Sequence, residues 1–127
     1  MLRFPPLGFL LLTLSAATPL VGQTTPADSA AAKGKKLFEG KGLCFSCHGL
    51  QGEGVLGPTT KLAAGKVWIH VKGGQDEIAA LIRSGIEVEK SQSGTAMPAR
   101  GGSRLTDAEV DLVAAYVLEL HKRKPVP

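Results

Sequence analysis

The chain has 127 residues, 43% of them hydrophobic, and carries a formal net charge of +4 from 15 basic and 11 acidic side chains. This length allows one domain with a limited core. The charge is only modestly basic and no motif combines basic with aromatic residues, so nucleic acid is excluded as an expected partner.

The first residues have the layout of a secretory signal peptide. Met1-Leu2-Arg3 gives a short positive start, residues 7–14 (LGFLLLTL) are apolar, and small residues follow up to Gly22. The apolar run is well short of the ~20 residues that cross a bilayer, so no stable membrane insertion is expected. No cysteine lies at the cleavage region to carry a lipid anchor. We expect a signal peptide over residues 1–22, cut within 17–23, and a soluble periplasmic mature protein.

The mature chain of about 105 residues is predicted to contain a flexible segment at residues 23–30 and one domain over residues 31–124. A first helix is expected over about residues 28–40, with Asp28 or Ser29 as its N-cap. A second is expected over about residues 76–84, ended by Gly85. The third and clearest begins at the capping box Thr106-Asp107-Ala108-Glu109, which precedes apolar residues at helical spacing. A short helix or turn is expected within residues 62–71, and no segment alternates like a strand, so the predicted fold class is all-α.

The stretch Cys44-Phe45-Ser46-Cys47-His48 holds both cysteines of the chain. The spacing C-x-x-C-H is typical of covalent c-type haem attachment. Cys44 and Cys47 would form thioether bonds to the two vinyl groups of one haem, and His48 would bind its iron. Because such a haem is attached after export, this motif agrees with the predicted signal peptide.

Three other readings of the cysteine pair remain open from the residues alone. A dithiol redox switch usually lies in a βαβ unit, and none is predicted here. A zinc site needs four ligands, and the remaining candidates are only the scattered His70 and His121. A structural disulfide is allowed in an exported protein.

The sequence contains two methionines, Met1 in the predicted leader and Met97. Met97 is therefore the only thioether of the mature chain that can be a second iron ligand. A histidine–methionine pair gives the iron a higher reduction potential than a histidine pair. The other candidates for the second iron ligand are His70 and His121. His121 lies near the end of the last predicted helix, where a histidine is usually a surface partner of the helix dipole.

The mature chain resembles the class I cytochromes c, the small bacterial single-haem type. The resemblance rests on the order of its features: a first helix with Gly34 and Phe38, the C-x-x-C-H stretch, Gly57-Pro58, Met97-Pro98, and a last helix with Tyr116. It implies a small cytochrome c fold of three main helices wrapped around one haem c, with the first and last helices crossing closely at Gly34.

The resemblance also implies roles for individual residues. His48 and Met97 would be the two axial ligands, and the backbone carbonyl of Pro58 would accept a hydrogen bond from His48 Nδ1–H. Trp68, Lys66 and Arg100 are candidate donors to the haem propionates.

By the same resemblance, the protein would be a periplasmic carrier of single electrons and not an enzyme. Lysines on the haem-binding half would steer redox proteins into transient electrostatic docking, with a monomer as the expected state. Two alternatives stay open. The chain could be a subunit that passes electrons into a larger oxidoreductase complex. It could also be a haem enzyme or gas sensor, if Met97 is not a stable ligand.

Overall fold

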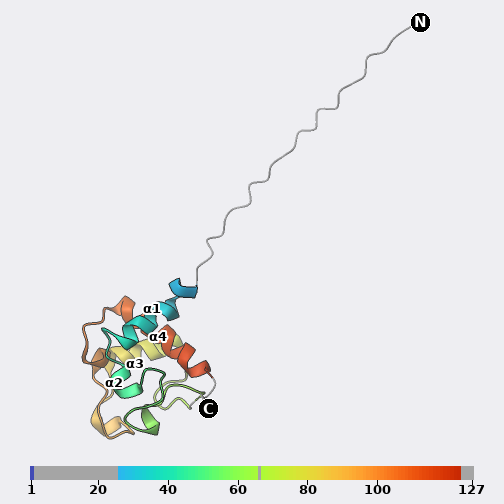
Figure 1. The fold of residues 1–127 in the computed structure, drawn as a ribbon. Coiled ribbons are helices and arrows are strands. Elements are labelled where there is room, and N and C mark those ends of the chain that lie inside the picture. Colours follow the sequence, from blue (N-terminus) through green and yellow to red (C-terminus); the bar gives the residue numbers. More distant parts are fainter. Residues whose placement is uncertain (2–25, 66, 124–127) are drawn as a thin grey trace.

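The computed structural model describes Met1, residues 26–65 and residues 67–123 (Figure 1). Within these residues the α-helices are α1 (Ala30–Glu39), α2 (Phe45–His48), α3 (Gln75–Ser84) and α4 (Asp107–Lys122), and short 3₁₀ segments lie at Pro26–Asp28, Pro58–Thr60, Val88–Lys90 and Ala99–Gly102. The described part contains no strand, only an isolated bridge between Ile86 and Met97. The prediction of an all-α fold is confirmed. The predicted signal peptide after Met1, and the end of the domain at 124, lie outside the described residues.

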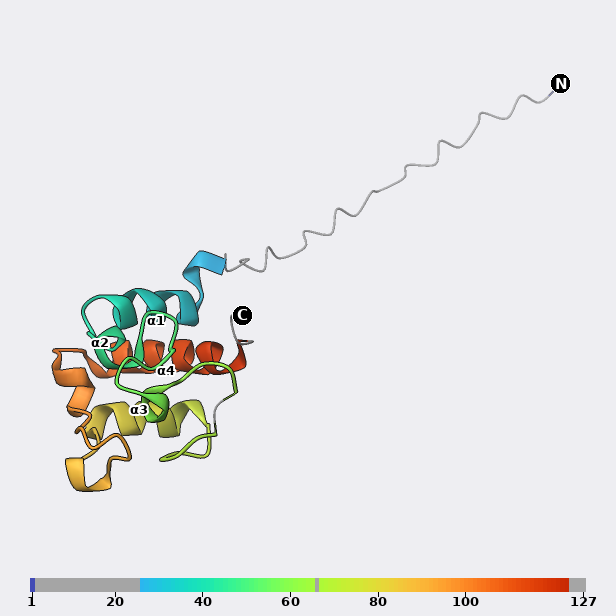
Figure 2. The same ribbon diagram turned by 60° about the horizontal axis from the view of Figure 1, so that its bottom comes forward.

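Helix α4 is the central element, with α1 and α3 packed on different sides of it (Figure 2). Its N-terminus has the predicted capping box: Thr106 Oγ1 accepts from Glu109 N at 3.3 Å, and Glu109 Oε2 accepts from Thr106 N at 2.8 Å. This pair satisfies two backbone donors that a helix start leaves free. The apolar residues that follow at helical spacing are buried, namely Val110, Val113, Ala114, Val117 and Leu120.

Helices α1 and α4 cross at Gly34. A Cβ atom at Gly34 would lie 1.9 Å from the backbone oxygen of Leu112, so only glycine permits this approach. One turn later the rings of Phe38 and Tyr116 meet edge to face, with centroids 5.3 Å apart and both side chains 1% exposed. Aromatic pairs prefer this geometry. The predicted close crossing is confirmed.

The other predicted boundaries differ from the observed ones by one or two residues. Helix α1 begins after Ser29, whose side chain accepts from Ala32 N at 3.1 Å. Helix α3 begins one residue earlier than expected, after Gly74. The four-residue helix α2 was not predicted, because one helical turn is too short to show an apolar periodicity. Within 62–65 and 67–71 the chain forms turns and no helix.

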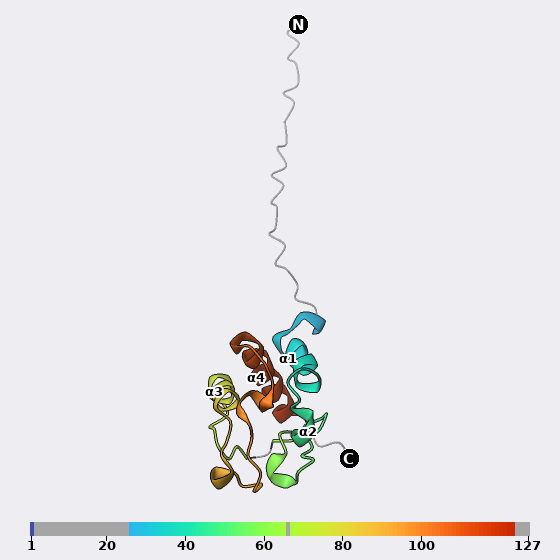
Figure 3. The ribbon, with the colours of Figure 1, turned by 90° about the vertical axis from the view of Figure 1, so that its left-hand side faces the viewer.

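Two long connections extend from the helices toward the same side of the molecule (Figure 3). One joins α2 to α3, and the other joins α3 to α4 and contains Met97. Together with α2 they enclose the cavities described below. No described helix is both long enough and apolar enough to span a membrane.

Candidate functional site

Helix α2 brings the two cysteines and His48 to one edge of the fold. His48 N donates to Cys44 O at 3.1 Å, and Gly49 N donates to Phe45 O at 2.8 Å, which closes a single helical turn. Residues three apart on such a turn lie on the same face. Accordingly Cys44 and Cys47, both free thiols and both half-buried, line the same cavity.

Burial raises the pKa of the Cys44 thiol to about 11. A backbone hydrogen bond lowers this pKa in part, and the neighbouring Cys47 raises it further. Cys44 Sγ donates to Gly42 O at 3.4 Å. A catalytic or redox-active cysteine needs the opposite, a lowered pKa that yields a thiolate. The environment of Cys44 therefore disfavours a dithiol redox switch.

His48 has a fixed orientation. Its Nδ1 lies 2.7 Å from the backbone oxygen of Thr60, and because a carbonyl only accepts, Nδ1 carries the proton and Nε2 keeps its lone pair. Burial lowers the pKa of His48, and the bond to Thr60 opposes that shift. The imidazole is thus held in the neutral tautomer that a metal requires.

The acceptor is Thr60 and not Pro58, so the prediction for Pro58 is wrong in this structure. Pro58 begins the 3₁₀ segment Pro58–Thr60, and its own carbonyl accepts from Lys61 N at 3.4 Å. Thr60 N and Oγ1 both bond to Gly57 O, at 3.1 and 2.9 Å, and this tight turn directs the Thr60 carbonyl toward His48. A backbone acceptor has no side-chain signature, so the sequence could not single out Thr60.

Met97 lies in a loop, and its backbone is held by two hydrogen bonds to Ile86. Met97 N donates to Ile86 O at 2.9 Å, and Ile86 N donates to Met97 O at 2.8 Å. Gly85 has φ +72°, and a Cβ there would lie 2.3 Å from Met97 O. The end of α3 therefore positions Met97, a contact that the sequence analysis did not predict.

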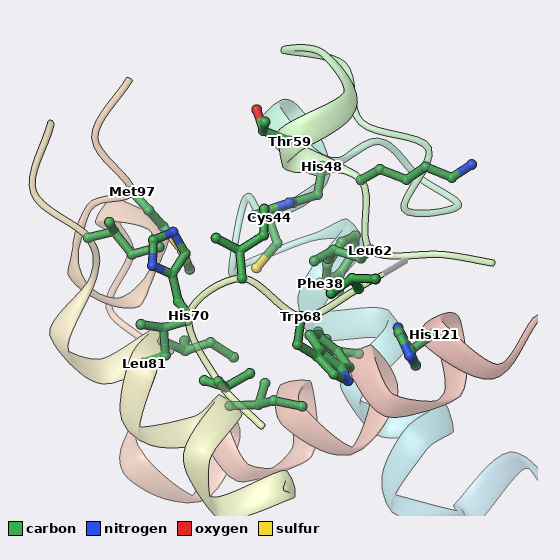
Figure 4. A pocket seen from close by; sticks show the side chains of 18 residues that line it. Phe38, Cys44, His48, Thr59, Leu62, Trp68, His70, Leu81, Met97 and His121 are labelled. Carbon is green, nitrogen blue, oxygen red and sulfur yellow. The ribbon is translucent and has the colours of Figure 1, made fainter. Parts of the chain in front are cut away.

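These side chains meet at two adjoining cavities of about 120 and 280 Å³. Both are lined by the same seven residues, namely Cys44, His48, Thr59, Ile69, His70, Ile86 and Met97. Figure 4 shows His48 and Met97 reaching the cavity from different sides, with Cys44 between them. The remaining lining of the smaller cavity is mostly apolar, including Phe38, Leu62 and Ile82.

This donor set fits a haem. The cavity is apolar, as a porphyrin requires, and two thiols stand at one edge. A neutral imidazole and a thioether face it from different sides. Zinc fits less well, because no group of three or more histidine, cysteine or acidic side chains able to hold a metal ion occurs among the described residues.

Of the candidate donors to the haem propionates, Trp68 lines the smaller cavity and Arg100 lines neither cavity. The ring of Trp68 stacks on His121, with centroids 4.2 Å apart, and both line the smaller cavity. The Arg100 guanidinium instead donates to Leu105 O and to Asp107, so it is already paired. Lys66 lies outside the described residues.

Comparisons with known proteins agree with this geometry. Residues 29–117 match the family described as cytochrome c oxidase, cbb3-type, subunit III. The chain is 32% identical over 111 residues to cytochrome c6 of Picosynechococcus sp., covering 87% of this chain and 91% of that protein. No solved structure gave a significant match. The family match includes every predicted site residue from Cys44 to Met97.

Proposed function

The chain belongs to the cytochrome c family, and on this basis we propose that it is an exported single-haem electron carrier with His48 and Met97 as axial ligands. The observation that supports the proposal most directly is the shared cavity, which His48 and Met97 line together with both cysteines. Cys44 and Cys47 would hold the haem by thioether bonds. When bound, the haem supplies an iron that cycles between the ferric and ferrous states.

The protein's contribution is to hold both ligands in place in either state. Thr60 fixes the His48 ring through Nδ1 and strengthens it as a donor. Ile86 fixes the Met97 backbone with two hydrogen bonds. Two ligands held independently in this way change little in geometry when an electron arrives or leaves, so electron exchange needs little reorganisation. The apolar walls exclude water and favour the less charged ferrous site.

We infer the cellular compartment from the predicted signal peptide. A signal peptide over residues 1–22 would deliver the chain to the periplasm, where haem attachment to C-x-x-C-H takes place and where a small carrier would meet its redox partners. The test is the mass of the protein purified from the periplasmic fraction. We expect a chain lacking about the first 22 residues and carrying one haem. Haem attachment should fail in the double variant Cys44→Ser/Cys47→Ser.

A second candidate function rests on the description of the matched family as an oxidase subunit. Under it, the chain would pass electrons into a larger oxidoreductase complex as a permanent subunit. Stable co-purification with a catalytic partner would favour this function over that of a free carrier, and a monomer in size-exclusion chromatography would contradict it.

The axial ligands are tested by the ferric absorption spectrum. We expect a weak far-red sulfur–iron band in the wild type that is lost in Met97→Ala and retained in the surface control Val88→Ala. A wild type without this band would overturn the assignment of Met97. Carbon monoxide binding to the reduced wild type at neutral pH would indicate a labile ligand and would favour the haem enzyme or gas sensor.

A further inference from the structure

His70 is an imidazole on the cavity wall to which the proposed function assigns no role. Its side chain lines both cavities, each of which is also lined by His48 and Met97. In Figure 4 it projects from the connection before α3 into the part of the cavity where Met97 lies. The residue is exposed, and its imidazole makes no hydrogen bond or ion pair with the described residues. A free nitrogen donor therefore borders the cavity that already holds the two expected ligands.

The backbone around His70 is held far less than that around Met97. Among the described residues, no backbone hydrogen bond joins residues 67–71 to any other part of the chain, whereas Met97 exchanges two with Ile86. Segments with few backbone hydrogen bonds are the first to open in native proteins. Small shifts of His70 toward the cavity centre are accordingly easier than shifts of Met97.

The other spare histidine is differently placed. His121 stacks on Trp68, its carbonyl accepts from Gly65 N at 2.7 Å, and it lies on the central helix α4. It borders only the smaller of the two cavities. Its place in α4 holds His121 in the wall, whereas His70 lies on a segment with no backbone hydrogen bond to other described parts of the chain.

We propose that His70 is a reserve axial ligand, which binds the iron in place of Met97 whenever the thioether is absent or dissociated. The proposal rests on the function proposed above. The exchange breaks an iron–sulfur bond and forms an iron–nitrogen bond through the lone pair of a His70 ring nitrogen, with no electron transferred. Imidazole is a ligand well suited to iron. A histidine pair also gives a lower reduction potential than a histidine–methionine pair, so the exchange would make reduction of the protein less favourable.

The test compares haem-containing variants at one neutral pH by electron paramagnetic resonance and near-infrared magnetic circular dichroism. We expect ferric Met97→Ala to be low-spin with two nitrogen ligands, Met97→Ala/His70→Gln to be high-spin, and Met97→Ala/His121→Gln to remain low-spin. Met97→Leu, which keeps the side-chain volume, serves as a second background in case the alanine variant folds poorly. Far-UV circular dichroism checks the fold of each variant.

A binding titration provides an independent readout. If His70 occupies the iron in about nine of ten Met97→Ala molecules, the apparent Kd for added imidazole will be about tenfold higher than in Met97→Ala/His70→Gln. A high-spin Met97→Ala protein in a folded state, or equal Kd values for the two variants, would overturn the proposal for His70. This failure is distinct from failure of the proposed function, which is judged by the sulfur–iron band of the wild type alone.

Discussion

Arg100 donates to the carboxylate of Asp107 at 2.7 Å, and this ion pair ties the Met97 loop to the first turn of α4. The same guanidinium donates to Leu105 O at 2.8 Å. Asp107 also accepts from Arg83 of α3 at 3.2 Å. Arg100 follows Met97 by three residues, so the network anchors one side of the ligand loop while Ile86 holds the other.

Removal of the Arg100 guanidinium should loosen Met97. Arg100 has φ +54° and ψ +27°, a left-handed conformation in which glycine is comfortable. Arg100→Gly therefore removes the ion pair without adding backbone strain. We expect a weaker sulfur–iron band and an apparent Kd for added imidazole about tenfold lower than in the wild type, if the fraction with Met97 dissociated rises tenfold.

Two further variants separate this effect from a general loss of charge. Arg100→Lys keeps the charge but lacks the planar guanidinium. Its apparent Kd for imidazole should therefore lie between those of Arg100→Gly and the wild type. Glu119→Gln removes an ion pair with Lys122 on the surface of α4 and should leave the imidazole titration unchanged. An equal change in Glu119→Gln would mean that the loop does not depend on Arg100.

The same ion pair predicts a dependence of stability on pH. The hydrogen bond from Arg100, followed by that from Arg83, lowers the pKa of Asp107 below its ordinary value of 3.8. A group whose pKa is lowered on folding contributes stability that is present above its unfolded pKa and is lost as the pH falls through its folded pKa. The gap in thermal midpoint between wild type and Asp107→Asn should be full above about pH 5 and shrink as the pH falls below 3.8. In an Arg100→Gln background the gap above about pH 5 should be smaller.

The helix crossing supplies a test of the fold itself. Gly34→Ala would place a Cβ 1.9 Å from Leu112 O and force α1 away from α4. We expect a loss of about 3 kcal/mol in the free energy of unfolding, at the upper end of typical overpacking costs. Lys33→Ala, at an exposed position of the same helix, should change it by no more than about 0.5 kcal/mol. Urea denaturation of the haem-containing protein measures both, and equal stabilities would contradict the crossing.

The features that the sequence predicted are those carried by side chains. The capping box of Thr106 and Glu109 has a local chemical signature that survives without tertiary information, whereas the crossing at Gly34 was implied by the resemblance to the class I cytochromes c. The acceptor of His48 and the bridge of Ile86 with Met97 are made by backbone groups, which every residue possesses. Their partners depend on how two distant connections fold together, so neither contact could be read from residue types. The incorrect choice of Pro58 reflects this difference.

The turn at Thr60 should tune the iron through His48. Thr60→Val removes the hydroxyl that donates to Gly57 O at 2.9 Å, which we expect to cost about 1 kcal/mol and to loosen the carbonyl that accepts from Nδ1. A less firmly bonded imidazole is a weaker donor and stabilises ferric iron less, so the reduction potential should rise. Thr60→Ser keeps the hydroxyl and should restore the wild-type potential in a potentiometric titration. A potential unchanged in Thr60→Val would contradict this role of the turn.

The surface around Cys47 predicts where electrons are exchanged. Leu43, Val55 and Leu56 are 51%, 59% and 46% exposed, and the backbone of Val55 donates to Cys47 O at 3.0 Å. We call these three residues the apolar edge. Two lysines of the haem-binding half, Lys35 and Lys41, form ion pairs with Glu39 and Glu109. Short-lived electron-transfer contacts are small, and an apolar edge of this kind suits them.

Val55→Arg places a charge on the apolar edge without touching either cavity, because Val55 lines neither. We expect electron self-exchange between ferric and ferrous molecules, measured by nuclear magnetic resonance line broadening, to slow about tenfold, which corresponds to about 1.4 kcal/mol. Val88→Arg adds the same charge at a residue that is 46% exposed in the segment after α3, and it should have a much smaller effect. Equal slowing in both variants would mean that net charge controls the encounter, and electron exchange would then have to be assigned to a different surface.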